Sequence, residues 1–109
     1  MRFVLTEKIK QKVEVDVEFP IYREHSCENG SFFARTDMAD GKFRRIQFYK
    51  DTDGRFDDFE ISLSNSLSDD SSADYVLGRG KYACSEAKFM DNLKEFQQKV
   101  NEAVAICGF

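Results

Sequence analysis

The sequence predicts an α+β fold, in which an antiparallel β-meander of about five strands packs against one long C-terminal α-helix. Apolar and polar residues alternate through much of residues 2–64, and this period of two is typical of strands buried on one face. Pairs such as Asn29-Gly30 and Asp40-Gly41 separate the runs and favour tight hairpin turns. After Ser85 the apolar period changes to three and four residues, which is typical of an amphipathic helix.

The first strands are predicted near the start of the chain. Met1–Leu5 is a candidate short strand, and residues 13–19 (VEVDVEF) show the clearest strand alternation in the protein. Pro20 follows directly. Because proline cannot donate a ladder hydrogen bond, it marks a strand end, a bulge or a sheet edge.

The central hairpin is predicted over Phe43–Leu63. Two runs rich in aromatic and β-branched residues flank an Asp-Thr-Asp-Gly turn at residues 51–54. Alternation assigns one apolar face to the pair of strands. Its members are Ile46, Phe48, Phe59, Ile61 and Leu63.

The C-terminal part begins with a break. Residues 64–72 (SNSLSDDSS) lack the apolar content to pack a core and predict a mobile loop. Ala73–Leu77 is predicted as one more short strand. Ser85 suits a helix N-cap, the helix covers about 86–106, and Gly108 suits the position after its last turn.

One apolar stripe runs along the predicted helix. It comprises Phe89, Leu93, Phe96, Val100, Ala103 and Cys107. We expect this stripe to face the sheet and to form a single core with Val15, Val17 and the apolar face of the hairpin. Cys107 is then a small core residue.

The chain length bounds the organisation. With 109 residues the chain is expected to form a single domain, residues 1–109. The first ten residues lack the apolar segment of a signal peptide. Three cysteines, Cys27, Cys84 and Cys107, are an odd number without a disulfide spacing, so a reduced, cytoplasmic protein is expected.

Metal and catalytic chemistry find little support in the sequence. The turn at residues 51–54 fits part of an EF-hand loop, but Tyr49 stands at the first ligand position and the flanks alternate like strands. His25 and the three cysteines lack the spacing of a zinc site. We therefore expect no metal, no cofactor and no enzymatic activity. A small enzyme that uses His25, the only histidine, is a minor alternative.

The charge distribution supplies the main functional hypothesis. The segment from Asp51 to Asp74 contains eight acidic residues and one basic residue, Arg55. It therefore has a net charge of −7, and the rest of the chain has +3, for a total of −4. The acids are Asp51, Asp53, Asp57, Asp58, Glu60, Asp69, Asp70 and Asp74. We expect a non-enzymatic interaction protein that docks these carboxylates on the basic surface of a larger protein, such as a nucleic-acid-binding site. Small inhibitors carried by phages and small immunity proteins share this acidic composition.

The alternative function is binding of single-stranded nucleic acid. Phe43, Arg45 and Tyr49 are expected on the less apolar face of a central strand, where aromatic and basic residues can stack bases and contact phosphates. The net negative charge of the chain counts against this interpretation.

Overall fold

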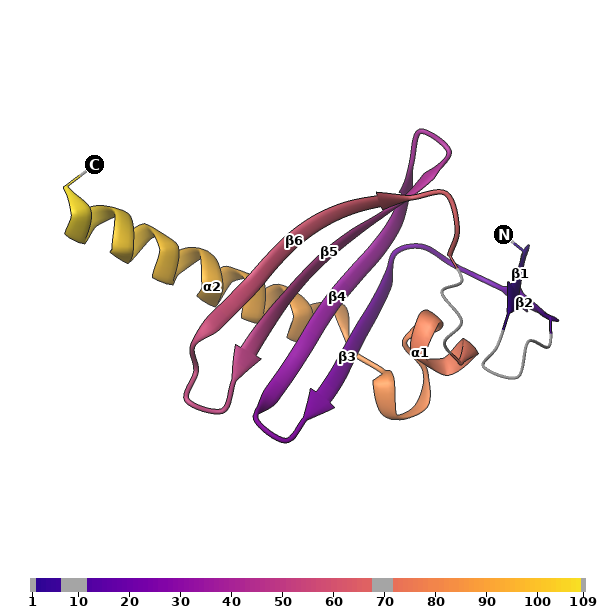
Figure 1. The fold of residues 1–109 in the computed structure, drawn as a ribbon, viewed down its shortest axis with the longest axis horizontal. Helices are drawn as coiled ribbons and strands as arrows, with labels where there is room; N and C mark the ends of the chain where they lie inside the picture. Colours follow the sequence, from indigo (N-terminus) through magenta and orange to yellow (C-terminus); the bar gives the residue numbers. More distant parts are fainter. Residues whose placement is uncertain (1, 7–11, 68–71, 109) are drawn as a thin grey trace.

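The computed structural model describes residues 2–6, 12–67 and 72–108. Its largest element is a four-stranded antiparallel sheet in the order β3-β4-β5-β6 (Figure 1). The strands are β3 (Ile21–Cys27), β4 (Gly30–Ala39), β5 (Lys42–Asp51) and β6 (Phe56–Ser64). The predicted α+β class, with an antiparallel meander and a long C-terminal helix, is confirmed.

The first two strands form a separate two-stranded sheet. β1 (Arg2–Thr6) pairs with β2 (Lys12–Asp16), and neither joins the meander. The prediction of one continuous meander is therefore wrong at this end. The chain turns at Phe19 and Pro20, where the proline has no N–H to continue a ladder, before β3 begins at Ile21.

Two of the predicted hairpin turns behave differently. At Asp40-Gly41 both residues have positive φ, 54° and 75°, as a tight two-residue hairpin requires, so this prediction is confirmed. The β3–β4 turn instead falls on Glu28 and Asn29, one residue early, and Gly30 is already in β4. Gly30 is needed for another reason: a Cβ there would collide with the Lys50 carbonyl oxygen and lie 2.6 Å from the Tyr49 hydroxyl.

A β-bulge interrupts the first half of β6. Gln47 pairs with Glu60 whereas Tyr49 pairs with Asp57, so β6 carries one extra residue between these pairs. Asp58 has a φ of 54°, in the left-handed region. The extra residue lets both Phe56 and Phe59 reach the same ring, that of Phe96.

In the described residues after β6 the chain forms three helical segments. They are α1 (Ala73–Leu77), the 3₁₀ turn η1 (Gly80–Tyr82) and α2 (Glu86–Cys107). The expected strand at residues 73–77 is wrong, because Ser72 caps the first turn of α1 through the Tyr75 N–H and Gly78 ends the helix at a φ of 64°. Of the expected loop, Leu67 is in fact buried, and residues 68–71 lie outside the described part of the chain.

The sheet is covered on both faces, so there are two cores rather than the single one expected. On one face Phe33, Phe48 and Phe89 are buried, with Ile46, Leu93 and Phe96 packed against them. On the other face Val17 joins Ile21, Phe43, Leu67, Ala73 and Val76. Alternation along β5 sends Phe43 and Phe48 to opposite faces, and α1 and α2 bury one face each. The side chain of Val15 lies outside the described set.

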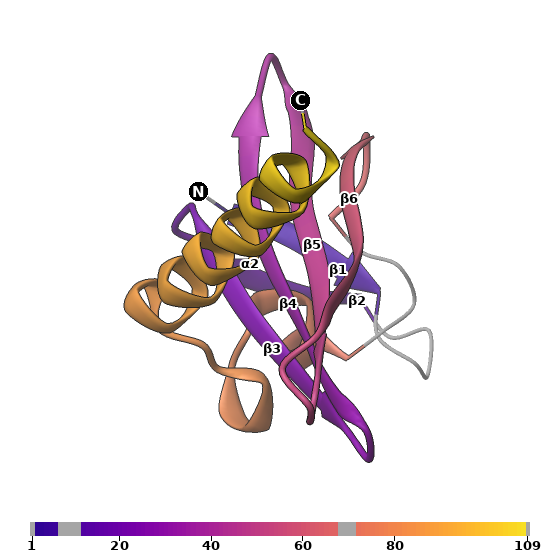
Figure 2. The same ribbon diagram turned by 90° about the vertical axis from the view of Figure 1, so that its left-hand side faces the viewer.

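Helix α2 starts and ends as predicted but runs past the sheet. The Ser85 hydroxyl accepts from the Lys88 N–H, and Gly108 has a φ of 79°. The helix crosses the sheet diagonally from β3 towards β6 (Figure 2). Its first turns are anchored, with Phe89 0% exposed, while its C-terminal turns overhang the sheet and leave Ile106 86% exposed. Cys107 is exposed as well, so its assignment to the core is wrong.

Candidate functional site

The two edges of the main sheet differ in how they are protected. At the β3 edge, Arg23 forms a β-bridge with Ala83, and its guanidinium donates to the Tyr75 carbonyl oxygen and stacks on the Tyr75 ring. The β6 edge pairs with no further strand among the described residues. β6 therefore presents a row of backbone N–H and C=O groups to solvent, which is the usual template for strand addition.

The side of β6 that faces α2 is apolar and open. Phe59, Ile61 and Leu63 are 50%, 60% and 62% exposed. Ile61 pairs with Ile46, which packs in the α2-side core, and this pairing sets the side of all three residues. Neighbouring exposed apolar residues on an edge strand form a candidate interaction surface.

A groove lies between β6 and α2. It has a volume of about 450 Å³ and is lined by Phe59, Leu93, Phe96, Gln97 and Val100. Phe96 forms its floor, with ring centroids 5.0 Å from Phe56 and 5.9 Å from Phe59. The overhanging part of α2 continues this apolar surface through Val100 and Val104, which are 47% and 42% exposed.

The acidic residues of β6 provide charge along the same strand. Asp57 pairs with Tyr49 and Glu60 with Gln47, on the sheet face opposite α2, and both acids are exposed. Asp58 is exposed within the bulge. None of these three carboxylates forms an ion pair with another described residue, so their charge is available to a partner. We call β6, these three acids and the groove the β6–α2 surface.

The other acids of the predicted patch are placed differently. The Asp51 carboxylate accepts from the N–H groups of Asp53 and Arg55 and so holds the β5–β6 turn, and Asp53 pairs with Arg55 at 3.4 Å. Asp74 pairs with Arg79 and lies on α1, which packs beside β3. Asp69 and Asp70 lie outside the described residues. Of the acids that the structure describes, Asp57, Asp58 and Glu60 therefore form one exposed group on β6.

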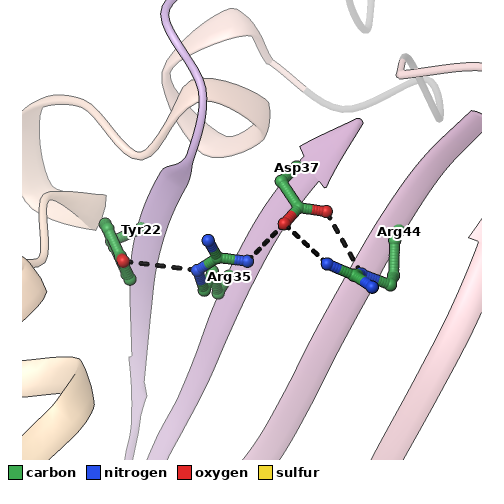
Figure 3. Close-up of polar contacts among 4 residues, drawn as sticks. All are labelled: Tyr22, Arg35, Asp37 and Arg44. Atoms are coloured by element: carbon green, nitrogen blue, oxygen red, sulfur yellow. Dashed lines mark hydrogen bonds and ion pairs between the residues drawn. The ribbon is translucent and has the colours of Figure 1, made fainter. Parts of the chain in front are cut away.

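The uncovered end of the α2-side face carries a polar row (Figure 3). Tyr22 accepts from Arg35 Nε at 3.3 Å, and Asp37 bridges Arg35, at 2.5 Å, and Arg44, at 3.0 Å. Burial opposes ionisation of Asp37, whose side chain is 14% exposed, but the hydrogen bonds and charges of Arg44 and Arg35 outweigh it and lower its pKa. Burial likewise opposes the charge of Arg35, and its bonds to Tyr22 and Asp37 still raise its pKa. This row ties three strands together beside Leu63.

The alternative nucleic-acid face is not an open surface. Phe43 is buried, with its ring centroid 5.4 Å from Phe3 and 6.0 Å from Phe19. It cannot stack a base without opening that core. Tyr49 packs on Phe32 with centroids 4.8 Å apart, and Arg45 lies half-buried beside Thr36.

His25 lies among aromatic rings near α1. Its centroid is 5.5 Å from Tyr75 and 5.6 Å from Tyr82, both edge-on. Within the described ranges no acid or thiol forms a hydrogen bond or an ion pair with its imidazole. The Cys27 thiol points instead to the His25 carbonyl oxygen, at 4.0 Å.

No group of three or more His, Cys, Asp or Glu side chains gathers into a metal-binding arrangement in the described part of the chain. None of the described helices has the length and apolar content to cross a membrane. Comparisons with protein-family models, with curated proteins and with solved structures return no match for this chain.

The groove is the feature that the sequence did not reveal. The apolar stripe of α2 and the apolar side of β6 were both predicted, but as one closed core. The lengths of the two elements carried a signal. The apolar stripe continues to Cys107, and a helix of 22 residues is about 33 Å long, whereas a strand of nine residues is about 30 Å long. A diagonal helix of that length overhangs the sheet.

Proposed function

We propose that this protein is a non-enzymatic, cytoplasmic interaction protein that binds a basic site of a larger protein through the β6–α2 surface and thereby inhibits it. One observation carries the proposal: the open edge strand β6 has apolar residues on one side and unpaired carboxylates on the other, next to an apolar groove. Such a surface supports recognition of both backbone and side chains.

The pattern of β6 defines the chemistry of the partner. A strand added to β6 places every second side chain beside Phe59, Ile61 and Leu63, and the intervening ones beside Asp57 and Glu60. The best complement is therefore an extended segment that alternates apolar and basic residues. Each opposite-charge cross-strand pair contributes about 0.2–1 kcal/mol, and the groove accommodates an aromatic or aliphatic anchor.

The same charges disfavour pairing of β6 with a second copy of the chain. An antiparallel β6–β6 pair that keeps the apolar side chains together brings the Glu60 side chains of the two copies to opposed or diagonal positions on one face, and β6 has no basic residue to pair with them. Unlike a basic segment, a second copy supplies no counter-charge. Each like-charge contact at about 5 Å costs roughly 1 kcal/mol in water. The acids thus favour a basic partner over self-association.

The proposed inhibition depends on where segments that alternate basic and apolar residues occur in other proteins. Strands that alternate basic and apolar residues are typical of surfaces that contact phosphates, and carboxylates seated there exclude the natural anionic ligand. The acidic composition of phage-borne inhibitors and small immunity proteins supports the same role. The buried Phe43 gives the nucleic-acid alternative no support.

A peptide titration tests the proposal. The probe is a fluorescent peptide of about eight residues that alternates lysine and valine, and its control has the same composition with the lysines contiguous. Anisotropy is expected to show saturable binding of the alternating peptide only. The test variant neutralises the edge with Asp57→Asn, Asp58→Asn and Glu60→Gln, and asparagine tolerates the positive φ of residue 58.

A matched variant controls for net charge. Glu18→Gln, Asp40→Asn and Asp91→Asn remove the same three charges from exposed positions outside β6. The control is expected to bind like the wild type, while the edge variant loses about tenfold or more in affinity. Equal weakening of both variants, or equal binding of the two peptides, would contradict the proposal. Affinity capture with mass spectrometry then identifies the natural partner.

A further inference from the structure

A second, smaller cavity lies on the sheet face opposite α2. It has a volume of about 130 Å³ and is bounded by side chains from β4, β5, β6 and the segment after β6. Its lining consists of Thr36, Phe43, Arg45, Ser62, Ser64, Ser66 and Leu67. Hydroxyl groups and one guanidinium thus surround a space that is large enough for a small ion.

The strand register builds this cavity around Arg45. Thr36 pairs with Arg45 across β4–β5, and Arg45 pairs with Ser62 across β5–β6. Directly opposed residues in antiparallel strands share a face, so the three side chains form one row. Phe43 and Leu67, both buried, form the apolar wall beside them.

Among the residues that the structure describes, none supplies a counter-charge to the guanidinium of Arg45. Its Nε is buried and has no hydrogen-bond partner, and none of the residues that the structure describes forms an ion pair with it. Glu60, the next β6 residue on this face, is exposed and does not pair with it. A buried donor on a charged group without a partner is costly, and an anion in the cavity removes that cost.

We propose that the Arg45 cavity binds a phosphate group, as inorganic phosphate or a small phosphate monoester. Arg45 supplies charge and a planar fork of donors, which suits phosphate oxygens. Thr36 and Ser62 supply hydroxyl donors from the neighbouring strands. A volume of about 130 Å³ admits the phosphate.

Titration of ¹⁵N-labelled protein with sodium phosphate, exchanged against sodium chloride at constant ionic strength, tests this site. Saturable amide shifts are expected at Thr36, Arg45 and Ser62, with half-saturation at low-millimolar phosphate or below. Arg45→Gln is expected to weaken binding at least about tenfold, and Arg45→Lys to weaken it less, because lysine keeps the charge without the fork. Spectral dispersion confirms that each variant is folded.

Arg44→Gln is the matched control, since Arg44 neighbours Arg45 in sequence but lies on the other face in the Asp37 ion pair. It is expected to leave the titration unchanged. Linear, non-saturating shifts, or equal binding by the Arg45 and Arg44 variants, would overturn the assignment. Asp69 and Asp70 follow closely in sequence. Binding seen only after Asp69→Asn and Asp70→Asn would mean that the chain's own carboxylates occupy the site, and would overturn it too.

Discussion

Truncation of the apolar residues of α2, one at a time, should reveal a gradient of stability along the helix. Phe89 is 0% exposed, and its ring lies 5.3 Å from Tyr22 and 5.5 Å from Phe48. Removing a fully buried phenylalanine side chain costs about 3–5 kcal/mol. Phe96 has aromatic neighbours on one side and the groove on the other, so Phe96→Ala should cost roughly half as much, about 1.5–2.5 kcal/mol.

The gradient continues to the overhanging turns. Val100 is 47% exposed, and Val100→Ala should cost under about 1 kcal/mol. Gln98→Ala, at an exposed position on the other side of the helix, should change stability by less than about 0.5 kcal/mol. Because the chain has no tryptophan, urea unfolding is followed by far-ultraviolet circular dichroism. Equal losses for Phe89→Ala and Val100→Ala would refute the view that only the first half of α2 is anchored.

Three further predictions concern the scaffold. Asp37→Asn should lower the free energy of unfolding by about 1.5–3 kcal/mol near neutral pH. Because the pKa of Asp37 is depressed in the folded state, this difference from the wild type should shrink as the pH falls below about 4, as acid-unfolding curves would show. Gly78→Ala should cost more than about 2 kcal/mol in thermal melts, since its Cβ would meet a β3 carbonyl oxygen, whereas Gly41→Ala, also at positive φ but in open space, should cost about 1 kcal/mol. Burial, together with a nearby carboxylate, raises the pKa of Cys84, so at about pH 8 iodoacetamide should alkylate the exposed Cys27 and Cys107 before Cys84, as peptide mapping would show.

Local patterns carried most of the architecture. The period-two runs located the hairpin of β5 and β6. Asp40-Gly41 predicted the tight turn between β4 and β5, because both residues tolerate positive φ. Ser85 and Gly108 bounded α2 because capping depends on a few neighbouring residues. Each of these features depends on residues that are close together in the chain, so it can be predicted from the sequence alone.

The wrong predictions have two causes. The assignment of Ala73–Leu77 failed locally, because a five-residue segment fits a strand or a helix equally well until its caps, Ser72 and Gly78, decide. The other failures depend on long-range arrangement. The number of cores depends on whether one or both faces of the sheet are covered. The alternation of residues along β5 does not predict this. The groove exists because α2 crosses the sheet diagonally (Figure 2) and its C-terminal turns extend beyond the sheet (Figure 1). No local period encodes this arrangement.

Amide hydrogen exchange of β6, measured with and without the alternating lysine–valine peptide, tests the docking of a partner strand most directly. Strand addition would slow exchange at alternate residues of Phe56–Ser64, the ones whose N–H groups point away from β5, and leave the β3 edge unchanged. Slowed exchange confined to α2 or to the β3 edge, with the outward amides of β6 exchanging as in the free protein, would contradict this account.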